Sequence, residues 1–291
     1  MNQVSRIVLI GLALMLGLQS AELTGQSSNI YAFNFVKSGD NVTLSNARIL
    51  TAFNANGKNI DPTFVNESTL LISSNYFDKG QQDIVKMDLS TKKLTRLTQT
   101  PQSELQPEVV SDGQFTVILR ESGTSGVLHS YPLNLSNGGT TKINNMPSLT
   151  NYTWSKNENN LYTLEGEGRL LQLEGSNYKR SLLLDNVKSN LLLDKYNHLI
   201  FAHSLSANTT LLKKYDTAKK EYKTYAKTIN GTSVIAYLNN HQVLAASGSK
   251  LYLYNLVTTS LWEEIVDLTE YGIDNVSEII MGKNTMIVVA K

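Results

Sequence analysis

The sequence has 291 residues, of which 41% are hydrophobic and 18% charged, so it has enough apolar surface to fold and too little charge for disorder. Its 26 Lys and Arg residues balance 25 Asp and Glu residues, so charge gives no reason to expect nucleic acid or an anionic membrane surface as a partner. It contains no cysteine, which excludes a disulfide-supported fold and a lipoprotein anchor.

The first 21 residues have the order of a secretory signal peptide. Arg6 supplies a positive charge, residues 7–18 form an unbroken apolar run of twelve, and the small residues Ser20 and Ala21 follow. A run of twelve is too short to cross a bilayer as a helix. We therefore expect cleavage after Ala21 and a periplasmic or secreted product, residues 22–291, with no transmembrane segment. Removal of Arg6 leaves this mature chain electrically neutral.

A regular pattern begins near residue 60, after two strands expected at 30–35 and 42–51. Pro62-Thr63-Phe64 stands at the head of one unit, and Pro107-Glu108-Val109 stands at the head of the next, 45 residues further on. A fixed period of this size indicates a repeat architecture. Four short strands fit into each unit, which is the content of one β-propeller blade.

Alternating and compact apolar runs predict the strands of each unit in turn. The first unit has strands at 60–64, 69–74, 83–89 and 94–97, and the second at 108–110, 115–119, 127–133 and 140–143. The third has 152–154, 161–164, 170–173 and 179–184, and the fourth has 190–193, 199–203, 211–215 and 222–225. The fifth has 233–237, 242–246, 251–255 and 261–266, with a short helical turn within 263–270. Two strands, 277–281 and 285–289, remain in the tail.

Two strands are thus left over at each end of the chain. A ring of sheets closes without an exposed edge when one blade takes strands from both ends. Unit starts near 61, 106, 151, 190, 232 and 276 give spacings of about 39 to 45 residues, the length of a blade. We therefore predict an all-β, six-bladed propeller of four-stranded blades. Residues 22–291 should form a single domain, which we expect to be monomeric.

The best-defined units resemble TolB-like β-propeller repeats. The matching segments are NIDPTF at 59–64, DIVKMDL at 83–89, RLT at 96–98 and SELQP at 103–107. The resemblance implies a six-bladed propeller in the periplasm that works in an envelope complex with other proteins. The founding member carries an additional N-terminal α/β domain, for which this sequence leaves no room, so we do not expect a role in that particular complex.

The residues shared with these repeats have structural explanations. Pro62 and Pro107 begin inner strands, where a proline removes no hydrogen bond of the ladder. Asp83 and Asp88 bracket a strand, where each carboxylate is expected to accept backbone N–H groups of a neighbouring turn. These residues build blades and confer no activity by themselves.

Four residues are candidates for binding a ligand or partner. In a propeller, the links from the outer strand of one blade to the inner strand of the next lie at the mouth of the channel. Asp61, Glu104, Tyr152 and Trp154 fall on or beside such links, and an acidic and aromatic mouth would suit a sugar or a peptide segment. The alternative is that Glu104 pairs locally with a backbone N–H while Trp154 fills the interface between blades.

The sequence contains few motifs associated with catalysis or metal binding. The histidines fall in different predicted blades or on single strands, so we expect no metal site and no cofactor; they are His129, His198, His203 and His241. The segment GTSG at 123–126 is read as a hairpin loop because it lacks the context of a nucleophile elbow. The seven Asn-x-Ser/Thr sequences are assigned no glycosylation.

The sequence therefore predicts an exported, non-catalytic propeller that binds a protein or a glycan at its channel face. One alternative is a carbohydrate-active lyase or hydrolase on a propeller scaffold, and another is a sensor of a small ligand. Convergent Arg, His and carboxylate groups around a deep pocket would favour an enzyme. A broad aromatic or apolar rim would favour a protein or glycan partner.

Overall fold

The structure is a computed structural model. It describes residues 27–38, 41–110, 113–120, 123, 125–134, 139–144, 146–156, 160–188, 190–239, 241–258 and 261–291. The signal peptide expected at residues 1–21 lies outside the described residues. Within the described ranges, no helix is both long enough and apolar enough to cross a membrane.

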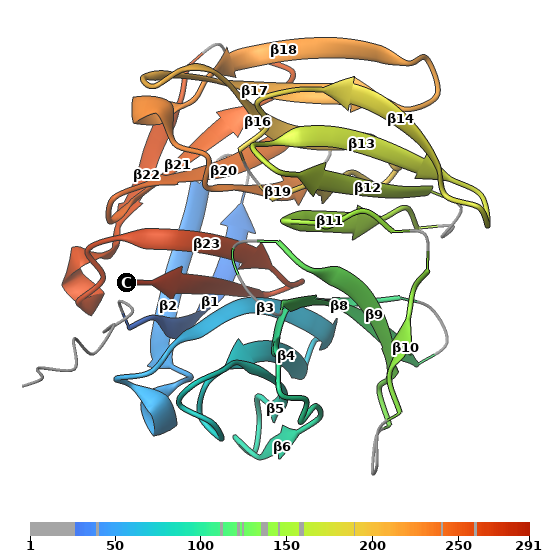
Figure 1. Cartoon of the computed structure of the whole chain (residues 1–291). Helices are drawn as coiled ribbons and strands as arrows, with labels where there is room; N and C mark the ends of the chain where they lie inside the picture. Colours follow the sequence, from blue (N-terminus) through green and yellow to red (C-terminus); the bar gives the residue numbers. More distant parts are fainter. Residues whose placement is uncertain are drawn as a thin grey trace, which may run out of the picture.

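Five antiparallel sheets of four strands follow one another along the chain (Figure 1). The first blade contains β3 (Asn59–Asn66), β4 (Thr69–Ser74), β5 (Asp83–Asp88) and β6 (Leu94–Arg96). The second contains β7 (Ser103–Val109), β8 (Gln114–Arg120), β9 (Val127–Pro132) and β10 (Thr141–Lys142). The third contains β11 (Asn151–Trp154), β12 (Asn160–Glu165), β13 (Arg169–Glu174) and β14 (Lys179–Leu184). The fourth contains β15 (Leu192–Leu193), β16 (Leu199–Ser206), β17 (Thr209–Asp216) and β18 (Glu221–Lys227), and the fifth contains β19 (Ile235–Asn239), β20 (Gln242–Ser247), β21 (Lys250–Asn255) and β22 (Glu263–Asp267).

The sixth blade joins the two ends of the chain. Its strand order is β2 (Asn41–Ile49), β1 (Asn29–Ser38), β24 (Thr285–Ala290) and β23 (Val276–Met281). Strand β1 pairs with β24 in antiparallel register from Asn29 opposite Ala290 to Asn34 opposite Thr285. The predicted fold class and the closure of the ring by N-terminal and C-terminal strands are confirmed.

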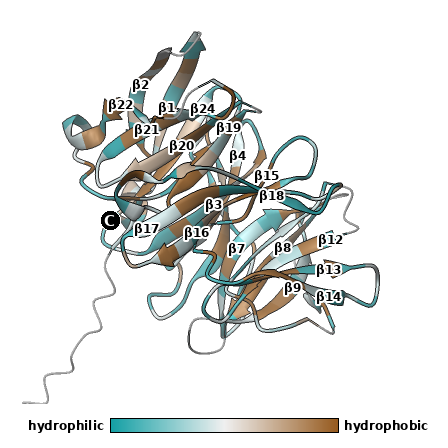
Figure 2. Cartoon of the chain, turned by 90° about the horizontal axis from the view of Figure 1, so that it is seen from above, coloured by the Kyte–Doolittle hydropathy of each residue, from teal (hydrophilic) through white to brown (hydrophobic). Residues whose placement is uncertain are grey.

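The hydrophobic core is divided into six clusters, one at each interface between neighbouring blades. Strand β4 shows why, because successive side chains of a strand point to opposite faces of its sheet. Leu70 and Ile72 pack against the sixth blade, whereas Leu71 packs against the second. All three are fully buried. Figure 2 shows hydrophobic segments on the strands and mainly hydrophilic loops between them.

The strand boundaries differ from the sequence prediction by at most three residues, with one larger exception. Strand β7 begins at Ser103, five residues before the predicted start, because the ladder with β8 continues across a bulge between Leu105 and Glu108. The bulge accommodates Pro107, which has no N–H to donate. Near the fifth blade, the helical turn expected within 263–270 is a 3₁₀ turn at Leu268–Tyr271 that follows β22. It starts where Asp267 accepts the N–H of Thr269.

Candidate functional site

A channel runs along the inner strands and contains two adjoining cavities. The links between blades, such as 97–102, and the turns between second and third strands, such as 166–168, lie at one end of the propeller, which we call the link face. The first cavity, of about 470 Å³, reaches this face at Gly166, Gly168 and Lys188. The second, of about 230 Å³, lies next to it, and both are lined by Gln106, Asn151, Asn190 and Glu278.

A pair of carboxyl groups, Asp61 and Glu278, lies in the wall of the second cavity. The backbone N–H of Asp61 donates to Oε1 of Glu278 over 3.3 Å, and the N–H of Gln106 donates to Oδ2 of Asp61 over 2.9 Å. Burial raises the pKa of Glu278 well above its usual range, and the negative charge of Asp61 raises it further. Burial also raises the pKa of Asp61, against the hydrogen bond from Gln106. The pair therefore retains a proton at a pH where an exposed pair would have lost both.

A β-bulge in the inner strand recurs in three consecutive blades, the sixth, the first and the second. It positions Glu278, Asp61 and Gln106. The register shifts between Ile60 and Thr63 in β3, across Gln106 in β7, and between Val276 and Glu278 in β23. Asp61 and Gln106 both have a left-handed backbone, with φ of 52° and 51°, immediately before a proline. Such a conformation is uncommon outside glycine and costs on the order of 1 kcal/mol or more. The repeated motif thus builds a bulge that turns a polar residue toward the channel.

Gln106 has one polar atom left without a partner. Its Nε2 donates to the carbonyl of Thr150 over 3.2 Å, whereas its Oε1 is buried and accepts no hydrogen bond among the described residues. A buried amide oxygen in this condition costs about 1–3 kcal/mol. This oxygen is therefore an unsatisfied acceptor beside the channel.

Side-chain amides continue the polar wall into the third and fourth blades. Nδ2 of Asn151 donates to Oδ1 of Asn190 over 3.1 Å, and Oδ1 of Asn151 accepts the N–H of Leu191 over 3.3 Å. Ser233 and Ser277 bring hydroxyl groups from the fifth and sixth blades to the first cavity. The channel wall thus offers neutral donors and acceptors together with the Asp61–Glu278 pair, and Glu167 and Lys188 add charged groups to the first cavity.

Two of the four predicted binding residues line the channel. Asp61 and Tyr152 are in the wall of the second cavity. Tyr152 is 5% exposed, and its hydroxyl donates to the carbonyl of Gln106 over 2.8 Å and lies 3.0 Å from the hydroxyl of Thr116. Trp154 lies at the interface between the second and third blades, where its indole N–H donates to the same Thr116 hydroxyl over 3.1 Å. Its side chain does not line either cavity.

Glu108 also lines the second cavity and links two blades. Its Oε1 accepts the hydroxyl of Thr153 over 2.9 Å and the N–H of Trp154 over 3.0 Å. Burial raises the pKa of Glu108 to about 7, although both hydrogen bonds favour the ionised form. The carboxyl group connects β7 to β11 and also contributes an acidic group to the channel.

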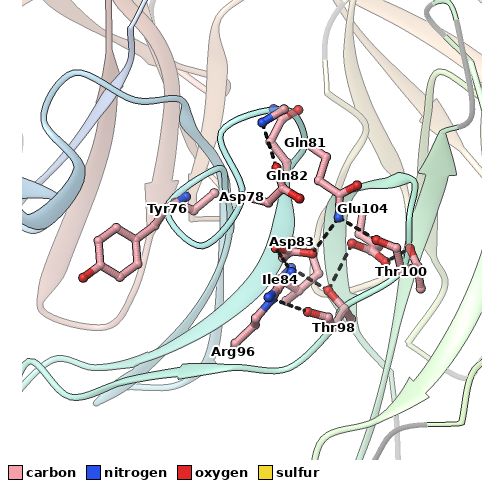
Figure 3. Close-up of polar contacts among 12 residues, drawn as sticks. Tyr76, Asp78, Gln81, Gln82, Asp83, Ile84, Arg96, Thr98, Thr100 and Glu104 are labelled. Atoms are coloured by element: carbon pink, nitrogen blue, oxygen red, sulfur yellow. Dashed lines mark hydrogen bonds and ion pairs between the residues drawn. The ribbon is translucent and has the colours of Figure 1, made fainter.

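Glu104 lies outside both cavities, in a buried polar network between the first and second blades (Figure 3). Its side chain is fully buried and accepts hydrogen bonds from the hydroxyls of Thr98 and Thr100. The backbone carbonyl of Glu104 accepts the hydroxyl of Ser73 over 2.6 Å. Burial is the main cause that raises its pKa to about 7, and the charge of Asp83 adds to it. Glu104 thus joins three segments of two blades, and its partners are hydroxyls instead of the backbone N–H considered above.

The two aspartates of the repeat motif have different roles. Oδ1 of Asp88 accepts the backbone N–H groups of Ser90 and Thr91 in the turn that follows, as predicted. Asp83 is fully buried, and its Oδ2 lies 2.7 Å from the guanidinium of Arg96, so its main partner is a charged side chain. Asp83 and Arg96 thus join β5 to β6 within the first blade.

An exposed aromatic cluster lies on the link face beside the first blade. Phe53, Tyr76 and Phe77 are in edge-to-face contact, with ring centroids 4.8 Å and 4.9 Å apart. Tyr76 and Phe77 are 39% and 43% exposed, and the guanidinium of Arg96 lies 5.5 Å from the centroid of Phe77. The loop that carries them is anchored by Asn75, whose Oδ1 accepts the side-chain amide of Asn54 over 2.9 Å. These rings are held in place while still facing solvent.

The histidines lie apart in the structure. Buried His129 has its Nδ1 2.9 Å from the hydroxyl of Thr140, and burial lowers its pKa. Burial also lowers the pKa of His203 on β16, whereas Nδ1 of His198 accepts the N–H of Thr217 and His241 is exposed. Within the described parts of the chain, no three His, Asp or Glu residues are grouped as metal ligands would be.

Several channel residues could not be identified from the sequence alone. Gln106 had one usable signal, since it occupies the position 45 residues after Asp61, immediately before the repeated proline. Glu278 precedes no proline and follows no motif, so its place in the channel depends on the closing blade. Asn151 and Asn190 resemble the many other Asn residues of turns and links.

Replacement of the protonated partner tests the carboxyl pair. We expect Glu278→Gln to lose less stability than the wild type when the pH rises from 6 to 9. Each unit by which the folded state raises the pKa of a carboxyl costs its ionised form about 1.4 kcal/mol, and Gln has no proton to lose in this range. Thermal unfolding at pH 6, 7.5 and 9 measures the effect, with the exposed Glu263→Gln as control. Parallel curves for Glu278→Gln and wild type would contradict the assignment.

Comparisons with known proteins support the fold alone. No protein-family model matches the sequence, and no curated protein matches it. Among solved structures, a chain of the nidogen/laminin complex is 9% identical, with a TM-score of 0.62 over 91% of this chain and 99% of that one. TolB from Acinetobacter baumannii is 12% identical, with a TM-score of 0.60 over 91% of this chain and 64% of TolB.

A lyase is also among the similar structures. Oligogalacturonate lyase from Vibrio parahaemolyticus is 7% identical, with a TM-score of 0.54 over 91% of this chain and 98% of the lyase. This chain therefore spans less than two thirds of TolB and nearly the full length of the lyase. At these identities the likeness establishes a shared architecture. The chain is a six-bladed β-propeller with TolB among its structural neighbours.

Proposed function

We propose that this chain is an exported, non-catalytic binding module that takes a glycan or a peptide segment of a partner protein at its link face. The observation that carries the proposal is the cavity of about 470 Å³ at the channel entrance, with its wall of amides and hydroxyls. Its volume falls within the range of small-ligand sites, roughly 300–1,000 Å³. Export is supported by the charged start and the apolar run of residues 7–18, which have the order of a signal peptide.

The chemistry of the wall suits neutral, hydrogen-bonding ligands. A side-chain amide both donates and accepts, so Gln106, Asn151 and Asn190 can match the hydroxyls of a sugar or the peptide groups of an extended segment. The exposed rings of Tyr76 and Phe77 on the same face add an apolar contact of the kind found at binding surfaces.

A plugged channel provides the test. We expect Ser233→Phe, which places a ring in the first cavity, to weaken partner or glycan binding tenfold or more without loss of the β-sheet circular dichroism signal. The matched control is Ser181→Phe on the exposed face of β14. Residues 22–291 would be used for pull-down from envelope extract and for a glycan array. Equal binding by the plugged variant and the wild type would refute the channel as the site.

The carboxyl pair favours a second candidate, a carbohydrate-active enzyme. Two carboxyl groups with raised pKa values in a cavity are a common feature of active sites that transfer protons. Incubation of the chain with a panel of polysaccharides tests this directly. Turnover that disappears in Asp61→Asn, together with the failure of the chain to retain any envelope partner, would replace the binding module by the enzyme.

A further inference from the structure

A third cavity, of about 460 Å³, lies between the first and second blades at the end opposite the link face. Apolar side chains lie along this interface, including Leu71, Ile84 and Phe115. The outer strands are short: β6 has three residues and β10 has two. The two sheets are therefore not covered at their outer edge, and the cavity opens between them.

The wall supplied by the first blade is polar and faces the second blade. Side chains two apart on a strand share a face, so Lys86 and Asp88 point the same way as Ile84, which packs against the second blade. Lys86 is paired with Thr95 across the strands, and the N–H of Asp88 donates to the carbonyl of Lys93 over 3.0 Å. Lysine is uncommon in an interface between blades, and Lys214, between the fourth and fifth blades, is paired there with Asp194 over 2.7 Å.

The two ammonium groups lack a counterion in this cavity. Neither Lys86 nor Lys93 has a carboxylate within 4.0 Å among the described residues, although both side chains line the cavity. Among the described residues that line the cavity, the one carboxylate is Asp88, which accepts the N–H and hydroxyl of Ser90 and the N–H of Thr91 through its Oδ1. Its hydrogen bonds thus belong to the turn. The described lining residues thus carry two ammonium groups against one carboxylate.

The second blade supplies a wall of different character. Gly113 has no side chain, and Leu133 with Val65 of the first blade forms an apolar patch. The side-chain amides of Asn66 and Asn134 stand at the exposed rim. Oδ1 of Asn66 is held by Ser68, which leaves its amide N–H groups free to donate to a ligand. An apolar patch, an amide rim and two ammonium groups therefore surround one space.

We propose that this cavity binds a carboxylated sugar. The apolar patch of Val65 and Leu133 would contact the C–H face of a pyranose ring, the amides and Thr95 would bind its hydroxyls, and Lys86 with Lys93 would bind its carboxylate. The volume accommodates one or two sugar units. The site is separate from the channel, so its test does not depend on the proposed function above.

Three small probes separate the contributions. Residues 22–291, isotopically labelled, are titrated with glucuronate, with glucose and with inorganic phosphate while amide signals of Gly113, Thr95 and Leu133 are followed by NMR. We expect glucuronate to shift these signals with a millimolar Kd, glucose to bind at least tenfold more weakly, and Lys86→Gln to weaken glucuronate at least fivefold. Lys179→Gln on β14 and the channel variant Ser233→Phe should leave glucuronate binding unchanged.

The contrary results are equally definite. If phosphate binds as tightly as glucuronate, the cavity recognises charge alone and the sugar assignment is wrong. If glucose matches glucuronate, the two lysines have no part in recognition. If none of the probes shifts the cavity signals in folded wild-type protein, or if only Ser233→Phe abolishes the shifts, there is no site between these blades.

Discussion

A disulfide between Asn34→Cys and Thr285→Cys is expected to raise the free energy of unfolding by about 4 kcal/mol relative to the reduced form of the same variant. The two residues face each other where β1 pairs with β24, and the adjacent pair, Phe35 and Asn284, carries a backbone hydrogen bond. Asn34 and Thr285 are therefore a non-hydrogen-bonded pair, whose Cα atoms lie about 4.5 Å apart in an antiparallel ladder. This separation lies within the range that a disulfide spans, roughly 4.4–6.8 Å.

The large effect follows from the position of the bond in the chain. It connects the first blade-forming strand with the last and encloses nearly the whole sequence, so it removes much of the entropy of the unfolded chain. The chain has no native cysteine that could exchange with the new pair. Urea unfolding with and without reductant measures the effect, and Asn34→Cys alone is the control. Failure of the double variant to oxidise under mild conditions would show that the ring is not closed by these strands.

The closure was predictable because two strands are left over at each end of the sequence. A ring of blades leaves no exposed sheet edge only if these strands join in one blade. Strand β4 is recognisable from its run of apolar residues, since it is buried on both faces. The 45-residue spacing of Pro62 and Pro107 allowed the strands of the first two blades to be aligned with each other in the sequence. The start of β7 was not predictable, because Ser103-Glu104 reads as a polar link and becomes a buried strand only when the second blade packs on the first.

The candidate site was less accessible to sequence analysis than the fold. Asp61 was found because it stands beside a repeated proline, and Tyr152 because it begins an inner strand. Glu278 reaches the channel only through a bulge in β23, and nothing in its local sequence indicates a bulge. Its effect on Asp61 also depends on the contact between the closing blade and the first blade, which joins residues 217 positions apart. Contacts of this kind form only when the ring of blades closes, and no local sequence pattern indicates them.

Glu104→Gln is expected to make the protein about 3 kcal/mol more stable than the wild type at pH 8 and to leave its stability unchanged near pH 4. The pKa of Glu104 rises from the ordinary value of 4.5 to about 7 in the folded state. Between these two values the folded chain keeps a proton that the unfolded chain has released. Stability from this group is therefore complete below pH 4.5 and is lost as the pH rises to about 7.

The surrounding hydroxyls allow the amide to replace the protonated acid. The hydroxyl of Thr98 accepts the N–H of Ile84 and donates to Oε2 of Glu104, so an amide oxygen can take the same place. The hydroxyl of Thr100 can instead donate to the carbonyl of Gln102, 3.1 Å away, and accept from the new amide N–H. One amide N–H thus has a partner in Thr100, and the repulsion between Glu104 and Asp83 is removed.

Chemical denaturation of the wild type and of Glu104→Gln at pH 4, 6 and 8 measures the difference between them. Glu108 ionises in the same range and affects both proteins alike, so the difference isolates Glu104. Glu263→Gln, on exposed β22, should follow the wild type at each pH. A constant difference across the three pH values would mean that the pKa of Glu104 is the same in the folded and unfolded states, so that Glu104 is ionised in the folded state by pH 6. The network between the first two blades would then be held by a charge, and Arg96 would have to balance two carboxylates instead of one.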